Sequence, residues 1–376
     1  MAVESCVSAR VGHHHTTTVL VLNAGSSSLK YNLWSGGAEL ARGTVDRPGS
    51  MSAALETAFA AIGSQAVDAV GHRVVHGGGR FDGPVLVDAA VEQAIDELGV
   101  IAPLHNPHSL EGIRAVRARM PKVPQVAVFD TSFHHTLPPE AYAYAVPERL
   151  GIRRYGFHGI SHQYVSQRYA ELAGRSPETL RVITCHLGNG CSVCAVEGGR
   201  SVDTSMGFTP MEGLVMGTRC GDIDPGAILH LLSTKQTQVD DLRRILNSES
   251  GLLAVSGVSN DMRDVLKAVG DGDLRAELGV ALFCYRVKKY IGAYLAAMNG
   301  ADAVVFTGGI GEHSPEVRLR ICSGLDWLGV SLNPAANLAV EGEGRIGFGP
   351  VAVWVVPTRE EMVIARETAS LLAGKK

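Results

Sequence analysis

Residues 18–34 read TVLVLNAGSSSLKYNLW, and this stretch decides the predicted fold. Residues 19–22 form an unbroken apolar run rich in β-branched side chains, which is typical of a buried strand. Residues 23–28 are small, polar and uncharged, and the apolar segment 29–34 predicts a return strand. A turn of this composition exposes N–H groups and hydroxyls that can bind phosphate oxygens, and Lys30 adds a positive charge at its rim.

A second stretch, residues 181–196, has the same form and reads RVITCHLGNGCSVCAV. Aligning the two turns on their glycines pairs Gly25 with Gly188, Asn23 with His186 and Ser26 with Asn189. Two such hairpins about half a chain apart predict a duplicated domain with a phosphate-binding turn in each half. The alternative is a pair of ordinary β-hairpins, because Gly, Asn and Ser are common in turns.

Composition limits the classes of protein that fit the chain. Its 376 residues suit two domains, and 45% hydrophobic residues supply ample core. A formal charge of −4 argues against nucleic-acid and membrane-surface partners, and no apolar run reaches the ~18 residues that span a bilayer. Residues 1–17 lack the apolar centre of a signal peptide, so we expect a flexible tail in which His13, His14 and His15 are incidental.

The cysteines indicate a reducing, cytoplasmic environment. There are seven, an odd number with irregular spacing. Cys185 and His186 with Cys191 and Cys194 resemble half a zinc site, but no second pair follows at zinc-finger spacing. Since two of these cysteines lie within the expected return strand, we favour buried free thiols over a metal site.

Charged residues follow two further expected strands. Arg73 comes after a strand predicted at residues 66–70, and Asp130 follows the strand predicted at 126–129. Ligands of open α/β sheets bind at the carboxyl ends of strands, so these residues are candidates for a site. The alternatives are a solvated surface Arg73 and an Asp130 that caps a turn. Prolines cluster between 121 and 147, which places the domain boundary near residue 150.

Later segments add a long polar loop and a glycine turn. Arg219 lies in a Gly-rich loop, where it can bind a phosphate or carboxylate or form a salt bridge with Asp222 or Asp224. Residues 303–306 predict a buried strand, followed by the turn TGGIGEH and a helix, an arrangement that suits the adenosine end of a nucleotide. Neither a Walker A motif nor a dinucleotide fingerprint is present.

With these segments together, the chain from residue 18 to about 373 resembles the acetate kinase family. The resemblance depends on NAGSSSLK, HRVVHGG, APLHNP, FDTSFH, YGFHG, HLGNG, DTSMGFTP, GTRCGDIDP and FTGGIGEH, all in order. It implies an α/β fold with two duplicated actin-like domains, a nucleotide cleft between them and a homodimer. The expected domains are 18–150 with 361–376, which includes a closing helix, and 151–360, which carries the nucleotide site and the dimer contacts.

The resemblance also implies roles for particular residues. The implied catalytic residues are Asp130, His158 and Arg219. The implied acetate-binding residues are Arg73 for the carboxylate and Val75, Leu104, Phe157 and Pro210 for the methyl group. The implied magnesium (or manganese) residues are Asn23 and Glu360. The implied ATP and ADP contacts are Ser26, Ser28 and Lys30 in the first turn, His186, Leu187, Gly188, Asn189 and Gly190 in the second, with Asn189 on the transferring phosphoryl group, and Asp261, Met262, Arg263, Gly309, Ile310, Gly311, Glu312 and His313 around the adenosine.

Three positions depart from the family's commoner pattern. His313 replaces Asn, Arg359 replaces Asn before the two glutamates, and Cys220 replaces Ser after Arg219. The second departure leaves open whether Glu360 or Glu361 serves the metal.

The implied reaction is reversible in-line transfer of a phosphoryl group from ATP to acetate. Acetate titrates near pH ~4 and is already ionised at pH 7, so we assign Asp130 to the geometry of the magnesium site rather than to general-base catalysis. The alternatives are a propionate or butyrate kinase and a chaperone-like ATPase, which would need a peptide-binding domain for which no length remains.

Overall fold

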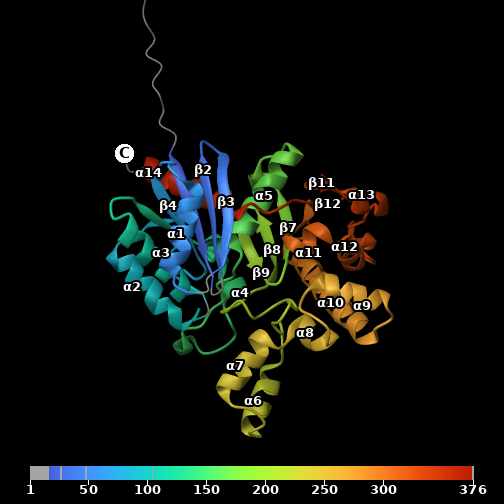
Figure 1. The fold of residues 1–376 in the computed structure, drawn as a ribbon. Coiled ribbons are helices and arrows are strands. Elements are labelled where there is room, and N and C mark those ends of the chain that lie inside the picture. The colour runs from blue at the N-terminus through green and yellow to red at the C-terminus, as the bar shows by residue number, and fades with distance from the viewer. Residues whose placement is uncertain (1–16, 26–27, 47–48, 104, 375–376) are drawn as a thin grey trace, which may run out of the picture.

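The computed structural model describes residues 17–25, 28–46, 49–103 and 105–374, and these residues form two mixed sheets with helices around them (Figure 1). The first sheet has the strand order β3-β2-β1-β4-β6-β5 and the second β11-β12-β10-β7-β8-β9. The strands of the first are β1 (Thr18–Ala24), β2 (Ser28–Ser35), β3 (Ala38–Asp46), β4 (Ala69–Val74), β5 (Val85–Leu86) and β6 (Gln125–Phe129). Those of the second are β7 (Arg181–Leu187), β8 (Cys191–Glu197), β9 (Arg200–Thr204), β10 (Ala303–Thr307), β11 (Gly344–Arg345) and β12 (Ala352–Val355).

The two sheets repeat one topology, as the paired hairpins predict. In each, three strands form an antiparallel meander whose first strand, β1 or β7, pairs in parallel with the next central strand, β4 or β10. Both meanders carry a register shift between their second and third strands. Asn23 pairs with Lys30 and His186 with Ser192, so both residues occupy the same place before their turns. The predicted duplication is confirmed.

Most helices lie around these sheets, whereas α6 and α7 project away from them (Figure 1). They are α1 (Met51–Ile62), α2 (Ala89–Glu97), α3 (Asn106–Arg119), α4 (Pro139–Tyr142), α5 (Gly159–Ala173), α6 (Pro225–Ser233), α7 (Val239–Ser248), α8 (Gly251–Ser256), α9 (Met262–Gly270), α10 (Leu274–Ala297), α11 (Gly308–His313), α12 (Pro315–Cys322), α13 (Pro334–Ala339) and α14 (Glu360–Ala373). Short 3-10 turns are Leu98–Val100, Ser132–Thr136, Glu148–Leu150, Pro177–Thr179 and Asp326–Leu328. Within the described ranges, none of these helices is both long and apolar enough to cross a bilayer.

Helices α5 and α14 each pack on the sheet that does not contain the strand before them. Helix α5 follows β6 but packs on β7 and β10, whereas α14 follows β12 and packs on β1, β4 and β6. Gly71 in β4 permits this contact, because a Cβ there would lie 2.6 Å from Thr368 Oγ1 and 2.7 Å from Ile364 Cγ2. One apolar core therefore includes side chains from both sheets and both crossing helices, among them Val21, Val165, Val305 and Ile364.

Two local predictions need correction. The strand predicted at 66–70 is β4, which runs from Ala69 to Val74 because its pairing with β6 continues to Phe129. The GGIGEH segment is not an open turn but forms α11 directly after β10.

Candidate active site

Arg73, Asp130 and Glu360 meet at the carboxyl ends of β4 and β6. The Arg73 guanidinium donates from Nε to Asp130 Oδ1 at 3.0 Å and from Nη2 to Oδ2 at 2.6 Å. Glu360, the first residue of α14, brings Oε2 to 3.6 Å from Arg73 Nε. The predicted alternatives for both residues are therefore wrong: Arg73 is not a solvated surface side chain, and the Asp130 carboxylate binds a guanidinium rather than capping a turn.

The electrostatics of this group reflect its burial. Burial alone would lower the pKa of Arg73, but the charges of Asp130 and Glu360 raise it above its ordinary value. Burial raises the pKa of Asp130 against the opposing charge of Arg73. Burial and the charge of Glu361 likewise raise the pKa of Glu360, while Arg73 and Lys30 oppose this change. One guanidinium thus holds two carboxylates together at the start of α14.

A second group of polar residues surrounds the turn between β7 and β8. His158, the residue before α5, has the left-handed φ of 56°, which is costly for a non-glycine residue and is typical of functional sites. Its side chain does not cap the helix but stacks on His186, with ring centroids 4.3 Å apart. A Cβ at Gly190 would lie 3.3 Å from His158 Nε2 and 3.7 Å from Arg219 Nη1, so Gly190 keeps space open between them.

Arg219 has no acidic partner among the described residues. Its Nη1 donates to Pro210 O at 2.8 Å and contacts Met216 Sδ, and burial lowers the pKa of the guanidinium. The predicted alternative of a salt bridge is wrong. Asp222 instead pairs with Arg286 at 3.1 Å, and Asp224 caps α6 by accepting from Gly226 N. A half-buried guanidinium without a carboxylate retains its capacity to bind an anion.

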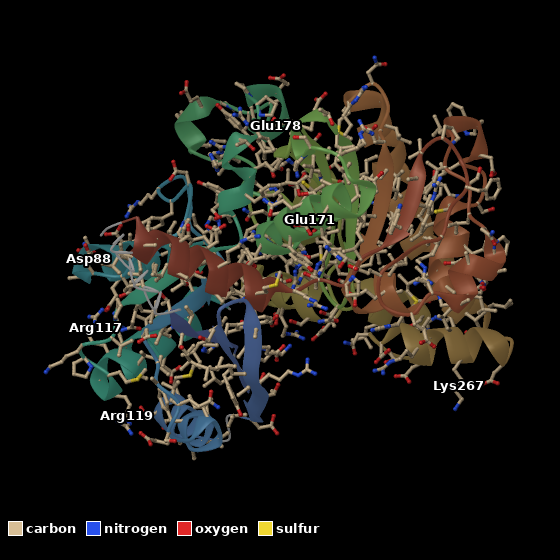
Figure 2. The ribbon with its side chains drawn as sticks, turned by 90° about the horizontal axis from the view of Figure 1, so that it is seen from above. Asp88, Arg117, Arg119, Glu171, Glu178 and Lys267 are labelled. Carbon is tan, nitrogen blue, oxygen red and sulfur yellow. The ribbon has the colours of Figure 1, made fainter. Side chains whose placement is uncertain are left out.

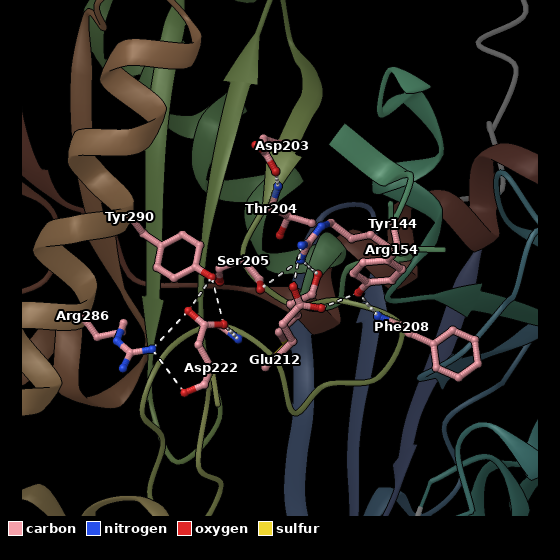
Figure 3. Close-up of polar contacts among 12 residues, drawn as sticks. Tyr144, Arg154, Asp203, Thr204, Ser205, Phe208, Glu212, Asp222, Arg286 and Tyr290 are labelled. Carbon is pink, nitrogen blue, oxygen red and sulfur yellow. Dashed lines mark hydrogen bonds and ion pairs between the residues drawn. The ribbon is translucent and has the colours of Figure 1, made fainter. Parts of the chain in front are cut away.

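A network of contacts fixes the loop that carries Arg219 and Pro210 (Figure 3). Glu212 pairs with Arg154 at 2.6 Å and with the Tyr144 hydroxyl, which in turn accepts from Phe208 N at 2.9 Å. Tyr290 donates to Asp222 Oδ2 at 3.0 Å from α10. Local motifs in the sequence gave no signal of this network, because its members come from three segments that are distant in the sequence, residues 144–154, residues 208–222 and helix α10.

The two polar groups influence one another across the halves. Burial lowers the pKa of His105 to about 4, and the charges of Arg219 and Arg73 both contribute. Burial and the neighbouring His186 hold the pKa of His158 well below its ordinary value, again with contributions from Arg73 and Arg219. The guanidinium charges therefore act on the same histidines although they belong to different halves of the chain.

The predicted methyl-pocket residues lie beside these groups. Phe157 is buried and Val75 packs against the same core, while Pro210 supplies the carbonyl that holds Arg219. His76 packs edge-on against Phe157, with centroids 5.4 Å apart, and Tyr155 lies against its ring. Leu104 falls outside the described residues.

The first turn carries partly buried residues and is followed by an exposed lysine. The Lys30 side chain is exposed, and its charge acts on Glu360. Asn23 is half-buried before the turn, and Ser28 O accepts from Gly25 N at 2.9 Å. Ser26 lies outside the described residues.

The predicted nucleotide contacts at the second sheet fall into two groups. Asn189 Oδ1 accepts from Asn260 Nδ2 at 3.2 Å, which links the second turn to the start of α9. Asp261 and Arg263 pair with each other at 2.6 Å on the surface, beside the buried Met262. The second group, next to the turn residues His186, Leu187 and Gly188, comprises Gly309, Ile310, Gly311, Glu312 and His313 of α11.

Arg318 is a residue that sequence analysis missed. Its side chain is buried without a carboxylate partner in the described chain, and burial lowers its pKa to about 10. Nη1 donates to the Gly311 and Glu312 carbonyls at 2.9 and 2.8 Å, so Arg318 holds the end of α11 in place. Glu312 Oε1 accepts from Gly308 N at 2.8 Å and from Thr358 N at 3.2 Å, which joins α11 to the segment before Glu360.

The cysteines do not form a metal centre in the described part of the chain. Cys185, Cys191 and Cys194 are buried free thiols, and burial raises the pKa of each. Across the described ranges, no group of three or more His, Cys, Asp or Glu side chains is placed to hold a metal alone. The predicted burial of Cys191 and Cys194 in the return strand is confirmed.

Comparison with known proteins agrees with this arrangement. The Acetokinase family model matches residues 48–366. The chain is 48% identical to an acetate kinase from Dictyoglomus turgidum, across 95% of this chain and 98% of that protein. A crystal structure of the Porphyromonas gingivalis acetate kinase superposes with a TM-score of 0.89 at 40% identity, and covers 95% of this chain and 100% of that one. A propionate kinase from Francisella tularensis gives a TM-score of 0.88 at 38% identity, over 94% and 99% of the two chains. The duplicated α/β architecture is the actin-like ATPase fold of these enzymes, and the chain belongs to the acetokinase family.

Proposed function

We propose that this protein is an acetate kinase that transfers the γ-phosphoryl group of ATP to acetate, reversibly, to give acetyl phosphate and ADP. The observation that carries the proposal is the Arg219 guanidinium, which has no carboxylate partner in the described chain and lies beside His158 at the Gly190 turn. Relatives named acetate kinase at 48% identity over nearly the full chain support the assignment.

The reaction joins two anions, so neutralisation of charge is the main task of the site. One acetate oxygen forms a bond to the γ-phosphorus while the bond from that phosphorus to the β–γ bridging oxygen breaks, and ADP leaves with the electron pair. Acetate is ionised at pH 7 because it titrates near pH ~4, so no proton has to be removed. Positioning and electrostatic stabilisation then supply most of the catalysis, as is general for phosphoryl transfer.

In this proposal the catalytic residues are Arg219, His158 and Asp130. Arg219 and His158 stabilise charge on the transferring phosphoryl group from the second half. Asp130 holds Arg73 in place through two hydrogen bonds and orders the metal side of the site. Arg73 binds the acetate carboxylate through Nη1, the nitrogen that its contacts with Asp130 and Glu360 do not use.

The methyl group of acetate lies against Val75, Leu104, Phe157 and Pro210. An apolar pocket discriminates one additional methylene by only about 1–3 kcal/mol. We therefore expect propionate to be a slower substrate. The similarity to a protein named propionate kinase makes propionate kinase the second candidate function.

ATP is proposed to bind between the two turns. Ser26, Ser28 and Lys30 contact phosphates from the first half, and residues 186–190 contact them from the second. Residues 261–263 and 309–313 surround the adenosine. The link between Asn189 and Asn260 supports a continuous surface from the phosphates to α9.

The residues Asn23 and Glu360 suit a magnesium ion bound to ATP. Mg²⁺ usually takes one or two protein ligands and completes its shell with phosphate oxygens and water. Glu360 supplies a carboxylate at the start of α14, and Asn23 supplies a half-buried side-chain amide just before the first turn. Magnesium or manganese would neutralise charge on the nucleotide phosphates when bound. Of the two glutamates, the contact of Glu360 with Arg73 favours Glu360.

The domain assignment is likewise a proposal: residues 18–150 with 361–376 form one domain and 151–360 the other. The packing of α5 on the second sheet supports a boundary near residue 150, and the packing of α14 on the first sheet supports its place in the first domain. Six free cysteines in the described chain are consistent with a reducing, cytoplasmic location.

The proposed assembly is a homodimer in which a second copy covers α6. This helix reads PGAILHLLS, is mostly apolar and has no buried residue, and Leu229 on it is 67% exposed. In Figure 1, α6 and α7 project away from both sheets. A competing face is the groove of about 770 Å³ along α10 and α12, where Leu278 and Tyr285 are exposed. Light scattering on Leu229→Glu and Leu278→Glu separates them, because only the contact face should yield monomers.

ATP-dependent formation of an acyl phosphate tests the activity. Hydroxylamine traps acyl phosphates as hydroxamates, so acetate, propionate and butyrate can be compared at equal concentration. We expect the highest kcat/KM for acetate and a lower value for propionate. A higher value for propionate would make this protein a propionate kinase, and ATP turnover without hydroxamate would exclude both assignments.

A further inference from the structure

A buried chain of hydrogen bonds connects His158 to the interior of the second half. His158 Nδ1 lies 2.9 Å from Ser192 Oγ, which lies 2.7 Å from His162 Nε2. His162 Nδ1 is in turn 2.7 Å from Thr184 Oγ1. Ser192, His162 and Thr184 are fully buried, on β8, α5 and β7, so this series joins three elements behind the candidate site.

The hydroxyl proton of Thr184 sets the donor and the acceptor in each of these three hydrogen bonds. A hydroxyl has one proton to donate, and the other acceptor near Thr184 is Cys194 O at 3.5 Å, at the limit of a hydrogen bond. The His162 Nδ1 atom at 2.7 Å is much closer, so Thr184 donates to it. A neutral His162 then carries its proton on Nε2 and donates to Ser192 Oγ, which leaves the Ser192 proton for His158 Nδ1.

This direction leaves the His158 proton on Nε2, the atom that faces Gly190 and Arg219. Burial holds the pKa values of His158 and His162 well below their ordinary range, which is consistent with neutral rings. The titratable or charged groups that act on His158 are His186, His162, Arg73 and Arg219. Since both arginines are cationic, they also oppose a positive charge on the imidazole.

We propose that Ser192, His162 and Thr184 are positioning residues that fix His158 as a neutral hydrogen-bond donor, with Nε2–H directed at the reacting anions. A neutral donor can bind phosphoryl and carboxylate oxygens without taking up a proton in either direction of the reaction. It also avoids a third positive charge next to Arg73 and Arg219. The inference rests on the proposed phosphoryl transfer for its catalytic meaning, but the tautomer itself does not depend on that function.

The direct test is a two-bond ¹⁵N–¹H correlation spectrum of the ¹⁵N-labelled full-length protein at pH 7. His158 is assigned by the signal that disappears in His158→Gln. We expect His158 to be neutral, with the proton on Nε2. A proton on Nδ1, or a doubly protonated ring, would overturn the proposal. Because this spectrum is independent of turnover, it can fail while the acetate kinase activity stands, and the hydroxylamine assay can fail while the tautomer is as expected.

Kinetics give the second test through Ser192→Ala, with Ser201→Ala as the matched control. Ser201 Oγ also contacts a buried histidine at 2.7 Å, His134 Nδ1, but this pair is not among the hydrogen bonds that link His158 to Thr184. Loss of the Ser192 hydroxyl should lower kcat about tenfold, the effect of one hydrogen bond, and leave both KM values within about threefold. Ser201→Ala should retain kcat within about threefold. An unchanged kcat in Ser192→Ala, or equal losses in both variants, would contradict the proposal.

Discussion

The two glycine turns occupy equivalent places in two copies of one sheet, but they present different chemistry. The first turn precedes an exposed Lys30 and has small polar residues around it. The second is enclosed by His158, His186 and Arg219, and is linked through Asn189 to α9. The duplicated sheet therefore gives both turns the same geometry, whereas the side chains around the two turns differ.

The packing of α5 and α14 explains how the two turns can act on one substrate. His158, the residue before α5, stacks on His186 of the second sheet, and Glu360, the first residue of α14, contacts Arg73 of the first sheet. Charged residues outside the candidate site, such as Asp88, Arg117 and Lys267, lie at the periphery of the molecule (Figure 2). We therefore expect chemistry to depend on the second turn and binding more on the first.

The largest effect should come from Arg219. Replacement with Ala removes a charge-stabilising group and should lower kcat by about 100-fold or more in the acyl phosphate assay. Arg243→Ala is the control, because Arg243 is an exposed arginine paired with Asp240 on α7. A kcat within a few-fold of the parent protein would remove Arg219 from the chemistry of the second turn.

Low pH should destabilise the fold. Burial lowers the pKa of His72 and of His134, whose ring contacts Ser201 of the second sheet, to about 4. Between pH 6.5 and 4 the unfolded chain binds these protons and the folded chain does not, so the free energy of unfolding falls as the pH falls. Each such histidine should lower the free energy of unfolding by about 3 kcal/mol between pH 7 and pH 4.

Urea unfolding at pH 7 and pH 5 measures this effect. His72→Gln should reduce the loss of stability between these two values, since one proton-binding group is removed. An equal loss in the variant and the parent protein would show that His72 does not contribute, and an increase in stability at pH 5 would contradict the sign.

Arg73→Ala should raise the KM for acetate about tenfold or more, the loss expected for one charge-assisted hydrogen bond. The KM for ATP should change much less, because Arg73 is assigned to acetate, which accepts the phosphoryl group. Arg80→Ala provides a control, as Arg80 is exposed and paired with Glu97. An acetate KM equal to that of the parent protein would place the carboxylate elsewhere.

Lys30→Ala should have the smallest effect. An exposed cation contributes less than a half-buried one because water screens its charge. We expect the KM for ATP to rise about fivefold and kcat to stay within about threefold, and KM to rise less at high salt. A fall in kcat as large as that of Arg219→Ala would contradict the proposal that the first turn serves binding more than chemistry.

The sequence allowed much of the fold to be predicted, because strand patterns and glycine turns are local. The repeated hairpins gave the duplication, and the strand ends identified Arg73 and Asp130 as a pair of candidates. The exchange of α5 and α14 could not be predicted from local patterns, since packing between distant segments determines it. The same holds for Arg318, which acts on backbone carbonyls of α11, and for Ser192, whose neighbours come from other elements.

The most direct measurement is a crystal structure with ADP, aluminium fluoride as the phosphoryl mimic, magnesium and acetate. The account predicts that Arg73 Nη1 contacts the acetate carboxylate and that Arg219 and His158 Nε2 contact the fluoride group beside Gly190. A structure in which these ligands bind away from both turns, while Arg219 remains only on Pro210 O, would contradict it.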